Sequence, residues 1–297
     1  MEIKNKPEDF IVEEIIDLEC TGGNYGYYKV VKKDRNTLDV VADIARCAGV
    51  KRKDVGFAGS KDRRAVTTQY VSVKGFKGEL RVRNADISFI GSGAKPISLG
   101  DLKGNKFKIK LDQEINFKVN FCVNYFGKQR FGKNNIEIGK AIVKKEFEKA
   151  CLLAEAEVEK KDFIGALRRF DKKLLRLFVH AYQSYLWNLY ARKYIDENYK
   201  NVNGFVLKKE ENVSIPLTSF DMESDEIYDS IFADEGVCKE DFLIREMPEL
   251  VSCCVYRELF VNVSDFVPDG YWVSFFLPSG SYATVVIEFL ETLINMK

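Results

Sequence analysis

Asp62 is the residue whose surroundings in the sequence most suggest chemistry, because Lys61, Arg63 and Arg64 stand beside it. Neighbouring positive charges favour the ionised form of a carboxylate and lower its pKa. An aspartate that stays ionised could act as a nucleophile or as an electrostatic anchor, and it would be a poor general acid. Most aspartates in polar loops only cap turns or pair with a nearby lysine, so the loop alone leaves both interpretations open.

Two extended segments are predicted to hold this loop. Residues 55–58 are short and apolar, while residues 66–73 alternate with a period of two and are rich in β-branched side chains. Both features are typical of strands. Asp62 is therefore expected on a turn between two strands.

The same periodicities predict the other elements. Strands are expected at residues 10–17, 25–31, 79–90, 106–111 and 270–277, and helices at residues 37–49, 134–160, 162–194 and 282–295. Thr37 is the predicted N-cap of the first helix, with Leu38, Val41, Ala45 and Ala48 on its buried face. Strands thus dominate the first half of the chain and helices follow residue 134, an order that does not by itself define a topology.

Two further stretches have the composition of an RNA-binding surface. Lys106, Lys108 and Lys110 alternate with apolar residues, which places three cations on one face of a strand. Residues 124–132 combine two glycines, three aromatic residues and two cations in a loop that could hold a base against a ring. The alternatives are a solvated strand face and an aromatic-anchored turn.

The charge distribution points to an anionic partner. The 297 residues carry a formal net charge of only +1. Residues 1–180, however, hold 37 lysines and arginines against 25 acidic residues, and residues 181–297 hold 9 against 20. Such asymmetry is typical of a chain whose first half binds a polyanion, although the two halves could also pair with each other.

Composition excludes several classes of protein. His180 is the only histidine, and the seven cysteines include no C-x-x-C pair, so neither a histidine-rich metal site nor a zinc site is expected. The first ten residues lack the apolar segment of a secretory signal, and no stretch approaches the ~18 apolar residues of a membrane span. A cytoplasmic protein is therefore expected.

Several stretches of the chain resemble the TruD family of tRNA pseudouridine synthases. Residues 56–67, GFAGSKDRRAVT, follow the family pattern G-[FY]-A-G-x-K-D-x-x-A-V-T. Residues 124–132, NYFGKQRFG, match N-Y-F-G-x-Q-R-F-G, and residues 277–284, LPSGSYAT, match L-P-x-G-S-[FY]-A-T. KNKPEDF at 4–10 and LGDLKGN at 99–105 add two further matches, so the resemblance covers nearly the whole chain.

The resemblance implies an enzyme that converts uridine to pseudouridine in RNA, typically at position 13 in the D arm of tRNA. It implies an α+β fold, in which a pseudouridine synthase core with a mixed, mostly antiparallel sheet carries an inserted α+β domain. Residues 1–160 would form the first part of the catalytic domain, residues 161–257 the inserted domain, and residues 258–297 the return segment of the catalytic domain.

The resemblance also implies roles for single residues. Asp62 matches the catalytic aspartate, Lys4 the basic residue that pairs with it, and Phe126 the aromatic residue that stacks on the target base. Asn124 and Tyr282 match positions that contact the substrate. The isomerisation breaks and remakes a glycosidic bond without redox or phosphoryl transfer, so no cofactor and no metal are expected.

The expected partner is tRNA, bound by a monomer. Extruding a uridine from folded RNA costs a few kcal/mol, which stacking on Phe126 would help offset. Binding should weaken steeply with salt because the basic first half supplies the phosphate contacts. The residues expected to make these contacts are Lys61, Arg63, Lys106, Lys108 and Arg130.

Two alternatives stay open at this point. One is a catalytically silent RNA-binding protein with the same fold, against which the intact Asp62, Phe126 and Lys4 argue. The other is an unrelated enzyme that binds an anionic small substrate through the cationic loop at 61–64. This second alternative predicts weak salt dependence and no preference for folded RNA.

Overall fold

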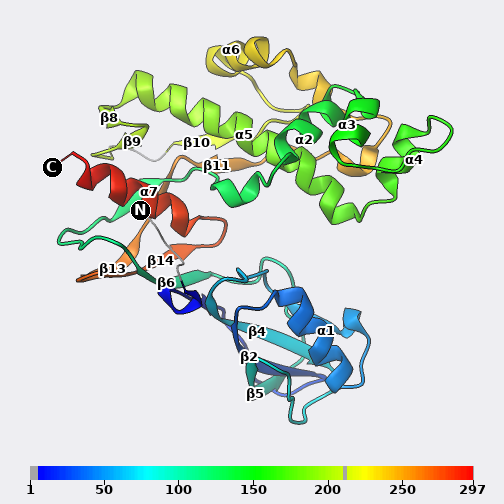
Figure 1. The fold of residues 1–297 in the computed structure, drawn as a ribbon, viewed down its shortest axis with the longest axis vertical. Coiled ribbons are helices and arrows are strands. Elements are labelled where there is room, and N and C mark those ends of the chain that lie inside the picture. Colours follow the sequence, from blue (N-terminus) through cyan, green and yellow to red (C-terminus); the bar gives the residue numbers. More distant parts are fainter. Residues whose placement is uncertain (1–5, 210–212, 297) are drawn as a thin grey trace. The chain divides into compact units, whose positions relative to one another are not determined.

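The computed structural model describes residues 6–209 and 213–296, which fold into two compact units (Figure 1). Unit 1 comprises Met1–Phe121 and Asn262–Ala283, and unit 2 comprises Cys122–Val261 and Thr284–Lys297. Each unit is thus built from two separate stretches of the chain. The functional division predicted at residues 160 and 257 is a different kind of boundary and stays a prediction.

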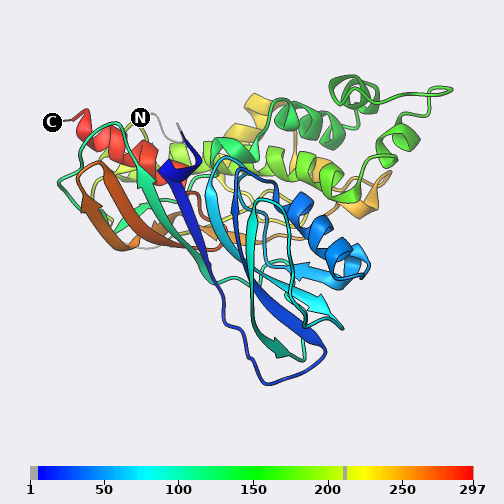
Figure 2. The same ribbon diagram turned by 60° about the horizontal axis from the view of Figure 1, so that its bottom comes forward.

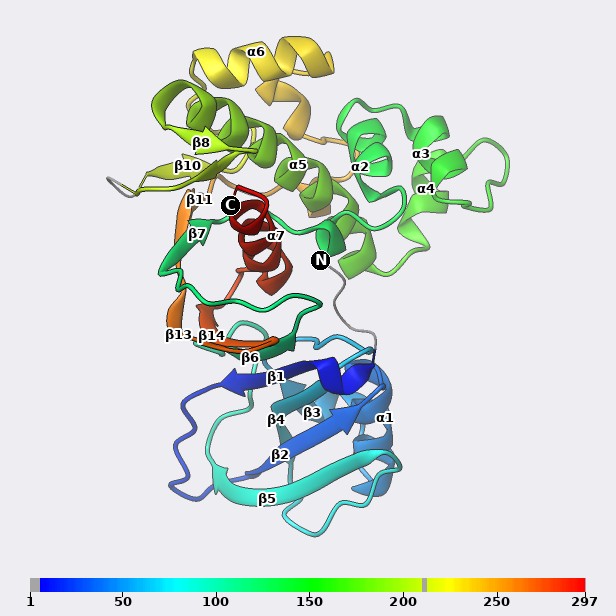
Figure 3. The same ribbon diagram turned by 60° about the vertical axis from the view of Figure 1, so that its left-hand side comes forward.

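Unit 1 is organised around an eight-stranded mixed sheet, seen in Figure 3. Its strands run in the order β13-β14-β6-β1-β4-β2-β5, and β3 pairs with the end of β4. The β1–β4 pair is parallel, whereas the other pairs are antiparallel, which confirms the predicted fold class. The strands are β1 (Phe10–Ile15), β2 (Tyr25–Lys33), β3 (Val55–Phe57), β4 (Val66–Lys74), β5 (Ala85–Gly93), β6 (Gly104–Lys110), β13 (Ser264–Asp269) and β14 (Trp272–Pro278).

The alternating sequence of β6 explains its place inside the sheet. Phe107 and Ile109 are buried, while the lysines between them are exposed. The first residue of the strand is Gly104. A Cβ atom at this position would lie only 2.2 Å from the carbonyl oxygen of Leu277, so no other residue fits without a shift. The glycine therefore permits close pairing of β6 with β14.

Helix α1 (Thr37–Cys47) lies beside this sheet, as Figure 2 shows. Its apolar residues form one core cluster with residues of β2, β3 and β4. Its buried face differs from the predicted one, because Leu38 is 55% exposed. Val41 and Ala45 are buried as predicted, and Val40 and Ile44 complete the face that packs against the sheet. Thr37 is the first helical residue and not the N-cap. Its hydroxyl accepts a hydrogen bond from the backbone N–H of Lys61 in the Asp62 loop.

Unit 2 is mainly helical, with α5 as its longest element (Figure 1). Its helices are α2 (Asn135–Val143), α3 (Phe147–Leu153), α4 (Phe163–Arg168), α5 (Lys172–Asn198), α6 (Glu226–Glu235) and α7 (Ala283–Ile294). Short two-stranded ladders accompany them: β7 (Phe121–Val123) with β12 (Phe260–Asn262), β8 (Asn201–Val202) with β9 (Phe205–Val206), and β10 (Ser214–Pro216) with β11 (Tyr256–Glu258). None of the helices in the described part of the chain has the length and hydropathy of a membrane span.

The single helices predicted at 134–160 and 162–194 are wrong, because each is broken in two. The first breaks between α2 and α3, where Lys145 has the left-handed φ of 60°. Its ammonium donates to the carbonyl oxygen of Asp241 at 2.8 Å, a partner 96 residues away. The second breaks between α4 and α5, where Asp171 caps α5 by accepting a hydrogen bond from Lys173 N.

Short 3₁₀ turns lie between the helices and strands, and one strand begins later in the sequence than predicted. The turns are η1 (Pro7–Asp9), η2 (Arg52–Asp54), η3 (Lys128–Arg130), η4 (Lys239–Phe242) and η5 (Pro248–Leu250). The strand predicted at 79–90 begins only at Ala85, because Gly75 and the residues after it form a loop.

Candidate active site

The Asp62 loop joins β3 to β4 in unit 1, as the sequence predicts. Asp62 itself is half-buried. The strand before the loop requires Gly56, because a Cβ there would lie 2.2 Å from the carbonyl oxygen of Ile97. Backbone bonds hold the loop at its other end, where Asp34 N donates to Ala65 O at 3.3 Å. The loop is therefore tied to the sheet on both sides of the aspartate.

Lys61 points into the protein, away from its neighbours in the sequence. Its ammonium pairs with the carboxylate of Glu14 on β1, and the two side chains are only 6% and 0% exposed. The other carboxylate oxygen of Glu14 accepts a hydrogen bond from Tyr70 N at 3.3 Å. Lys61 thus anchors the loop, and phosphate contact by Lys61 would require this buried pair to separate.

A buried polar network supports the loop from beneath. The backbone N–H of Lys61 donates to Thr37 Oγ1 at 2.9 Å, and that hydroxyl donates to Gln69 Oε1 at 3.0 Å. Thr37 and Gln69 are both buried. Because buried polar groups that bond one another hold a single geometry, this network fixes the conformation of the loop.

Lys32 was missed by the sequence analysis and lies directly at the Asp62 loop. It is 1% exposed, and its ammonium donates to the carbonyl oxygen of Asp62 at 3.0 Å. A signal for it exists, since Lys32 falls on the same face of β2 as the core residues Tyr28 and Val30. A lysine in phase with an apolar face indicates a buried cation.

The two arginines of the loop are more exposed than Lys61. Arg63 lies 3.7 Å from Asp34 in an ion pair whose side chains are both more than half exposed. Arg64 is exposed as well. The cations near Asp62 therefore differ from the three that were predicted. Lys61 pairs with Glu14, and Lys32 supplies a cation from another strand.

The basic face predicted on β6 is present in unit 1. Lys106, Lys108 and Lys110 are exposed, and Lys108 Nζ lies 5.3 Å from the ring centroid of Trp272 on β14. Glu13 of β1 stands opposite Lys106 in the ladder. The face thus offers cations beside an aromatic ring, an arrangement suited to phosphate and base contacts.

In unit 2, Arg257 holds both of the residues predicted to contact the base. Its Nε donates to the carbonyl oxygen of Asn124 at 2.9 Å, and its Nη2 donates to Asn124 Oδ1 at 2.6 Å. Its guanidinium lies 4.1 Å from the ring centroid of Phe126. Sequence analysis missed Arg257 because it lies 133 residues from Asn124.

Two residues of helix α5, Trp187 and Asn188, also hold Phe126 in place. Phe126 N donates to Asn188 Oδ1 at 2.9 Å, and Asn188 Nδ2 donates to the carbonyl oxygen of Phe126 at 2.9 Å. The ring of Trp187 meets that of Phe126 edge-on, with centroids 5.6 Å apart. Arg130, predicted to contact phosphate, has its guanidinium 6.0 Å from the Phe126 centroid and donates from Nε to Ser184 Oγ at 3.3 Å.

The remaining candidate residues have simpler surroundings. Tyr282 is half-buried and lies in the sequence after β14, directly before the first residue of α7. Lys4 lies outside the described residues. His180 is half-buried on α5, where burial, Arg130 and Arg176 all lower its pKa.

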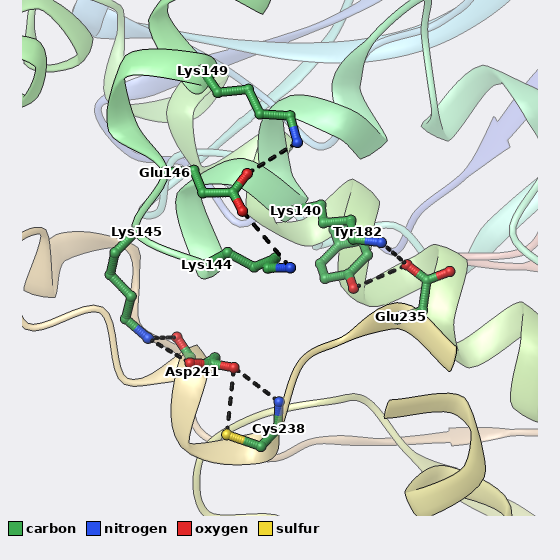
Figure 4. Close-up of polar contacts among 9 residues, drawn as sticks. All are labelled: Lys140, Lys144, Lys145, Glu146, Lys149, Tyr182, Glu235, Cys238 and Asp241. Atoms are coloured by element: carbon green, nitrogen blue, oxygen red, sulfur yellow. Dashed lines mark hydrogen bonds and ion pairs between the residues drawn. The ribbon is translucent and has the colours of Figure 1, made fainter. Parts of the chain in front are cut away.

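A second cationic cluster in unit 2 is neutralised by acidic partners, as Figure 4 shows. Four lysines around α2 and α3 each pair with a carboxylate: Lys140 with Glu235, Lys144 and Lys149 with Glu146, and Lys145 with Asp241. Burial alone would raise the pKa of Asp241, but hydrogen bonds from Cys238 N and Lys145 outweigh it and lower that pKa. The cluster cross-links the turn after α2 to residues 235–241 and is no independent anion site.

Comparisons with known proteins identify the family. The pattern of the family "tRNA pseudouridine synthase D (TruD)" matches residues 1–159, 151–217 and 191–289. A protein of Aquifex aeolicus named tRNA pseudouridine synthase D is 28% identical over 372 residues, covering 96% of this chain and 97% of that protein. A Thermococcus onnurineus protein described as a probable tRNA pseudouridine synthase D is 29% identical over 392 residues, covering 96% and 93%.

The fold is similar to a solved structure of the same family. The crystal structure of a TruD protein from Methanosarcina mazei matches with a TM-score of 0.68 and 25% identity, over 96% of this chain and 92% of that one. The alignment with the Thermococcus protein is longer than the 297 residues of this chain, so this relative carries insertions that the chain lacks. The chain belongs to the TruD family and is a tRNA pseudouridine synthase, an isomerase that converts uridine to pseudouridine in tRNA.

Proposed function

We propose that this synthase modifies the uridine at position 13 in the D arm of tRNA, with Asp62 as its catalytic carboxylate. The observation that supports the proposal is the set of contacts that hold the Asp62 loop in one conformation. Asp62 accepts a hydrogen bond from Lys32 at its carbonyl oxygen, and Lys61 bonds to Thr37 and Glu14. Preorganisation of this kind is what catalysis at a fixed position requires.

The chemistry assigned to Asp62 is consistent with an ionised carboxylate. Isomerisation breaks the bond from N1 of uracil to C1′, turns the base, and forms a bond from C5 to C1′. N1 gains a proton and C5 loses one, so the reaction is balanced without a co-reactant. Asp62 would act either by attack on C1′ or by removal of the 2′ proton, and both routes need it deprotonated.

The proposal assigns roles at the site to four further residues. Phe126 would stack on the target base, which is worth about 1–3 kcal/mol per base. Asn124 would supply a polar contact to that base, with its amide oxygen held by Arg257. Tyr282 would line the site, and Lys4 would pair with Asp62. We further propose that residues 161–257 act as an inserted domain and that the enzyme is a cytoplasmic monomer.

The decisive experiment is product mapping on unmodified tRNA transcripts. Wild-type enzyme should form pseudouridine at position 13 and at no other position. A transcript in which only this uridine is replaced by cytidine serves as the matched control and should yield no product. Product at another position would overturn the D-arm assignment, and no product from any tRNA would favour a binding protein.

Salt dependence tests the phosphate contacts of β6. Replacing Lys106 and Lys108 by glutamine should lower the slope of log K against log salt by about 0.7–0.9 for each lysine, since each releases roughly one counterion. Fluorescence anisotropy with labelled tRNA between low and moderate salt measures this slope. Lys149→Gln is the control, because Lys149 already pairs with Glu146. An unchanged slope in both β6 variants would remove this face from the tRNA-binding surface.

A further inference from the structure

Lys32 is a buried lysine near the end of β2. Its side chain lies on the strand face that also carries Tyr28 and Val30 and is 1% exposed. Lysine is almost never fully buried unless its charge is compensated, because removing an ammonium from water is costly. A buried lysine at this position therefore calls for a physical reason, and its contacts supply one.

The ammonium of Lys32 links two segments that are separate in the sequence. It donates to the carbonyl oxygen of Arg35 at 2.7 Å, in the segment before α1, and to that of Asp62 at 3.0 Å. The carbonyl oxygen of Lys61 lies at 3.5 Å, at the limit of a hydrogen bond. An ammonium has three donors and no acceptor, so these three oxygens use its full capacity. Lys32 thus ties the backbone of Asp62 to the β2–α1 connection.

Three charged groups face Lys32 from the elements around it. The carboxylate of Asp62 favours the charged ammonium, whereas Lys61 and Arg35 disfavour it. Lys61 is itself paired with Glu14, and Arg35 with Asp43. Among the surrounding charges, Asp62 is therefore the one that stabilises the cation.

We propose that Lys32 is a positioning residue for Asp62: its ammonium holds the peptide carbonyl of Asp62 in place and thereby fixes where the carboxylate lies. The proposal rests on the function assigned to Asp62. It goes beyond that function by naming a cation that lies outside the stretches matched in the sequence analysis and is supplied by another strand of the sheet. A shift of about 1 Å in a reacting group can cost roughly a hundredfold in rate, so a single backbone contact can matter greatly.

The contact should make catalysis sensitive to alkaline pH. Burial lowers the pKa of Lys32 from the usual 10.5 to about 8, although the charge of Asp62 acts against this. Above that pH, Lys32 loses one donor and its positive charge together. The rate of the chemical step should therefore fall as pH rises through about 8.

The contribution of Lys32 to the stability of the fold should increase as pH rises, whereas the reaction rate should decrease. The loss of rate can therefore be distinguished from unfolding. The unfolded chain keeps this lysine protonated up to about pH 10.5, while the folded protein releases the proton near pH 8. Between these values the unfolded state binds more protons, so the contribution of Lys32 to stability rises with pH. Loss of activity in this window would therefore be local and not caused by Lys32-driven unfolding.

The test compares Lys32→Met with Lys33→Met in single-turnover assays on the tRNA transcript from pH 6 to 9.5. Lys33 is the next residue of β2, faces solvent and pairs with Glu8, so its replacement should leave rate and pH profile unchanged. Lys32→Met should lower the rate by about tenfold to a hundredfold, remove the alkaline decline and leave the affinity for tRNA unchanged. A Lys32→Arg variant, whose charge persists at every pH tested, should recover part of the rate and show no decline.

A second measurement keeps the proposal testable if Lys32→Met fails to fold. In the wild type labelled with ¹³C at lysine Cε, one resonance should titrate near pH 8, and Asp62→Asn should move that titration to lower pH. No lysine titrating near pH 8, or no shift in Asp62→Asn, would overturn the proposal. So would a folded Lys32→Met variant with the rate and pH profile of the wild type. A wild type that forms no pseudouridine would refute the proposed function instead, while this titration would still report on the contact.

Discussion

Replacing Asp62 by alanine should lower the rate of pseudouridine formation by more than about a thousandfold, as removal of a central catalytic group commonly does. Affinity for tRNA should change little, because binding rests on phosphate contacts and base stacking elsewhere. The loop itself should persist, since Lys32 and Thr37 bond to its backbone, at Asp62 O and Lys61 N. Single-turnover assays with mapped product and anisotropy titrations with tRNA measure the two quantities separately.

Two variants make this experiment specific. Asp62→Asn keeps the size of the side chain and removes its charge, so it should be as inactive as Asp62→Ala if ionisation is what matters. Asp86→Ala removes an exposed carboxylate from β5 of the same unit and should be fully active. Wild-type activity in Asp62→Ala would refute the assignment of Asp62. Loss of tRNA affinity in parallel with activity would indicate a binding role for Asp62.

Breaking the buried ion pair between Glu14 and Lys61 should destabilise unit 1 by about 3–5 kcal/mol, because it leaves one charge buried without its partner. In Glu14→Ala the cation of Lys61 loses its carboxylate and Tyr70 N loses its acceptor. The double variant with Glu14→Leu and Lys61→Met removes both charges and should recover much of the loss. Glu13→Ala, at the next, exposed position of β1, is the matched control and should cost less than about 0.5 kcal/mol.

Urea denaturation can follow unit 1 by itself. The chain has two tryptophans, Trp272 in unit 1 and Trp187 in unit 2. In a Trp187→Phe background, fluorescence therefore reports the unfolding of unit 1, and each variant is compared in that background. A shift of the urea midpoint with an unchanged slope would indicate a true change in stability. A loss below about 1 kcal/mol in Glu14→Ala would show that the pair is open to water.

The strands were predicted better than the helices, because the alternation of a strand depends only on residues that are neighbours in the sequence. The period of two in β4 and β6 follows from one buried and one exposed face, and this pattern can be seen in the sequence. The break between α2 and α3 has no such pattern, because charged residues run through it. Lys145 adopts its left-handed conformation there while its ammonium bonds to Asp241, which belongs to a distant segment. Contacts of this kind are invisible to local periodicity.

The sequence by itself determined the family, the turn that carries Asp62 and the loop that carries Phe126, because these depend on residue types at short spacings. Only the tertiary structure decided which charges meet. Lys61 adjoins Asp62 in the chain yet pairs with Glu14, while Lys32, 30 residues away, binds the carbonyl of Asp62. Arg257 reaches Asn124 across 133 residues. Electrostatic and hydrogen-bond energies depend on distance in space, and the order of strands in the sheet sets that distance.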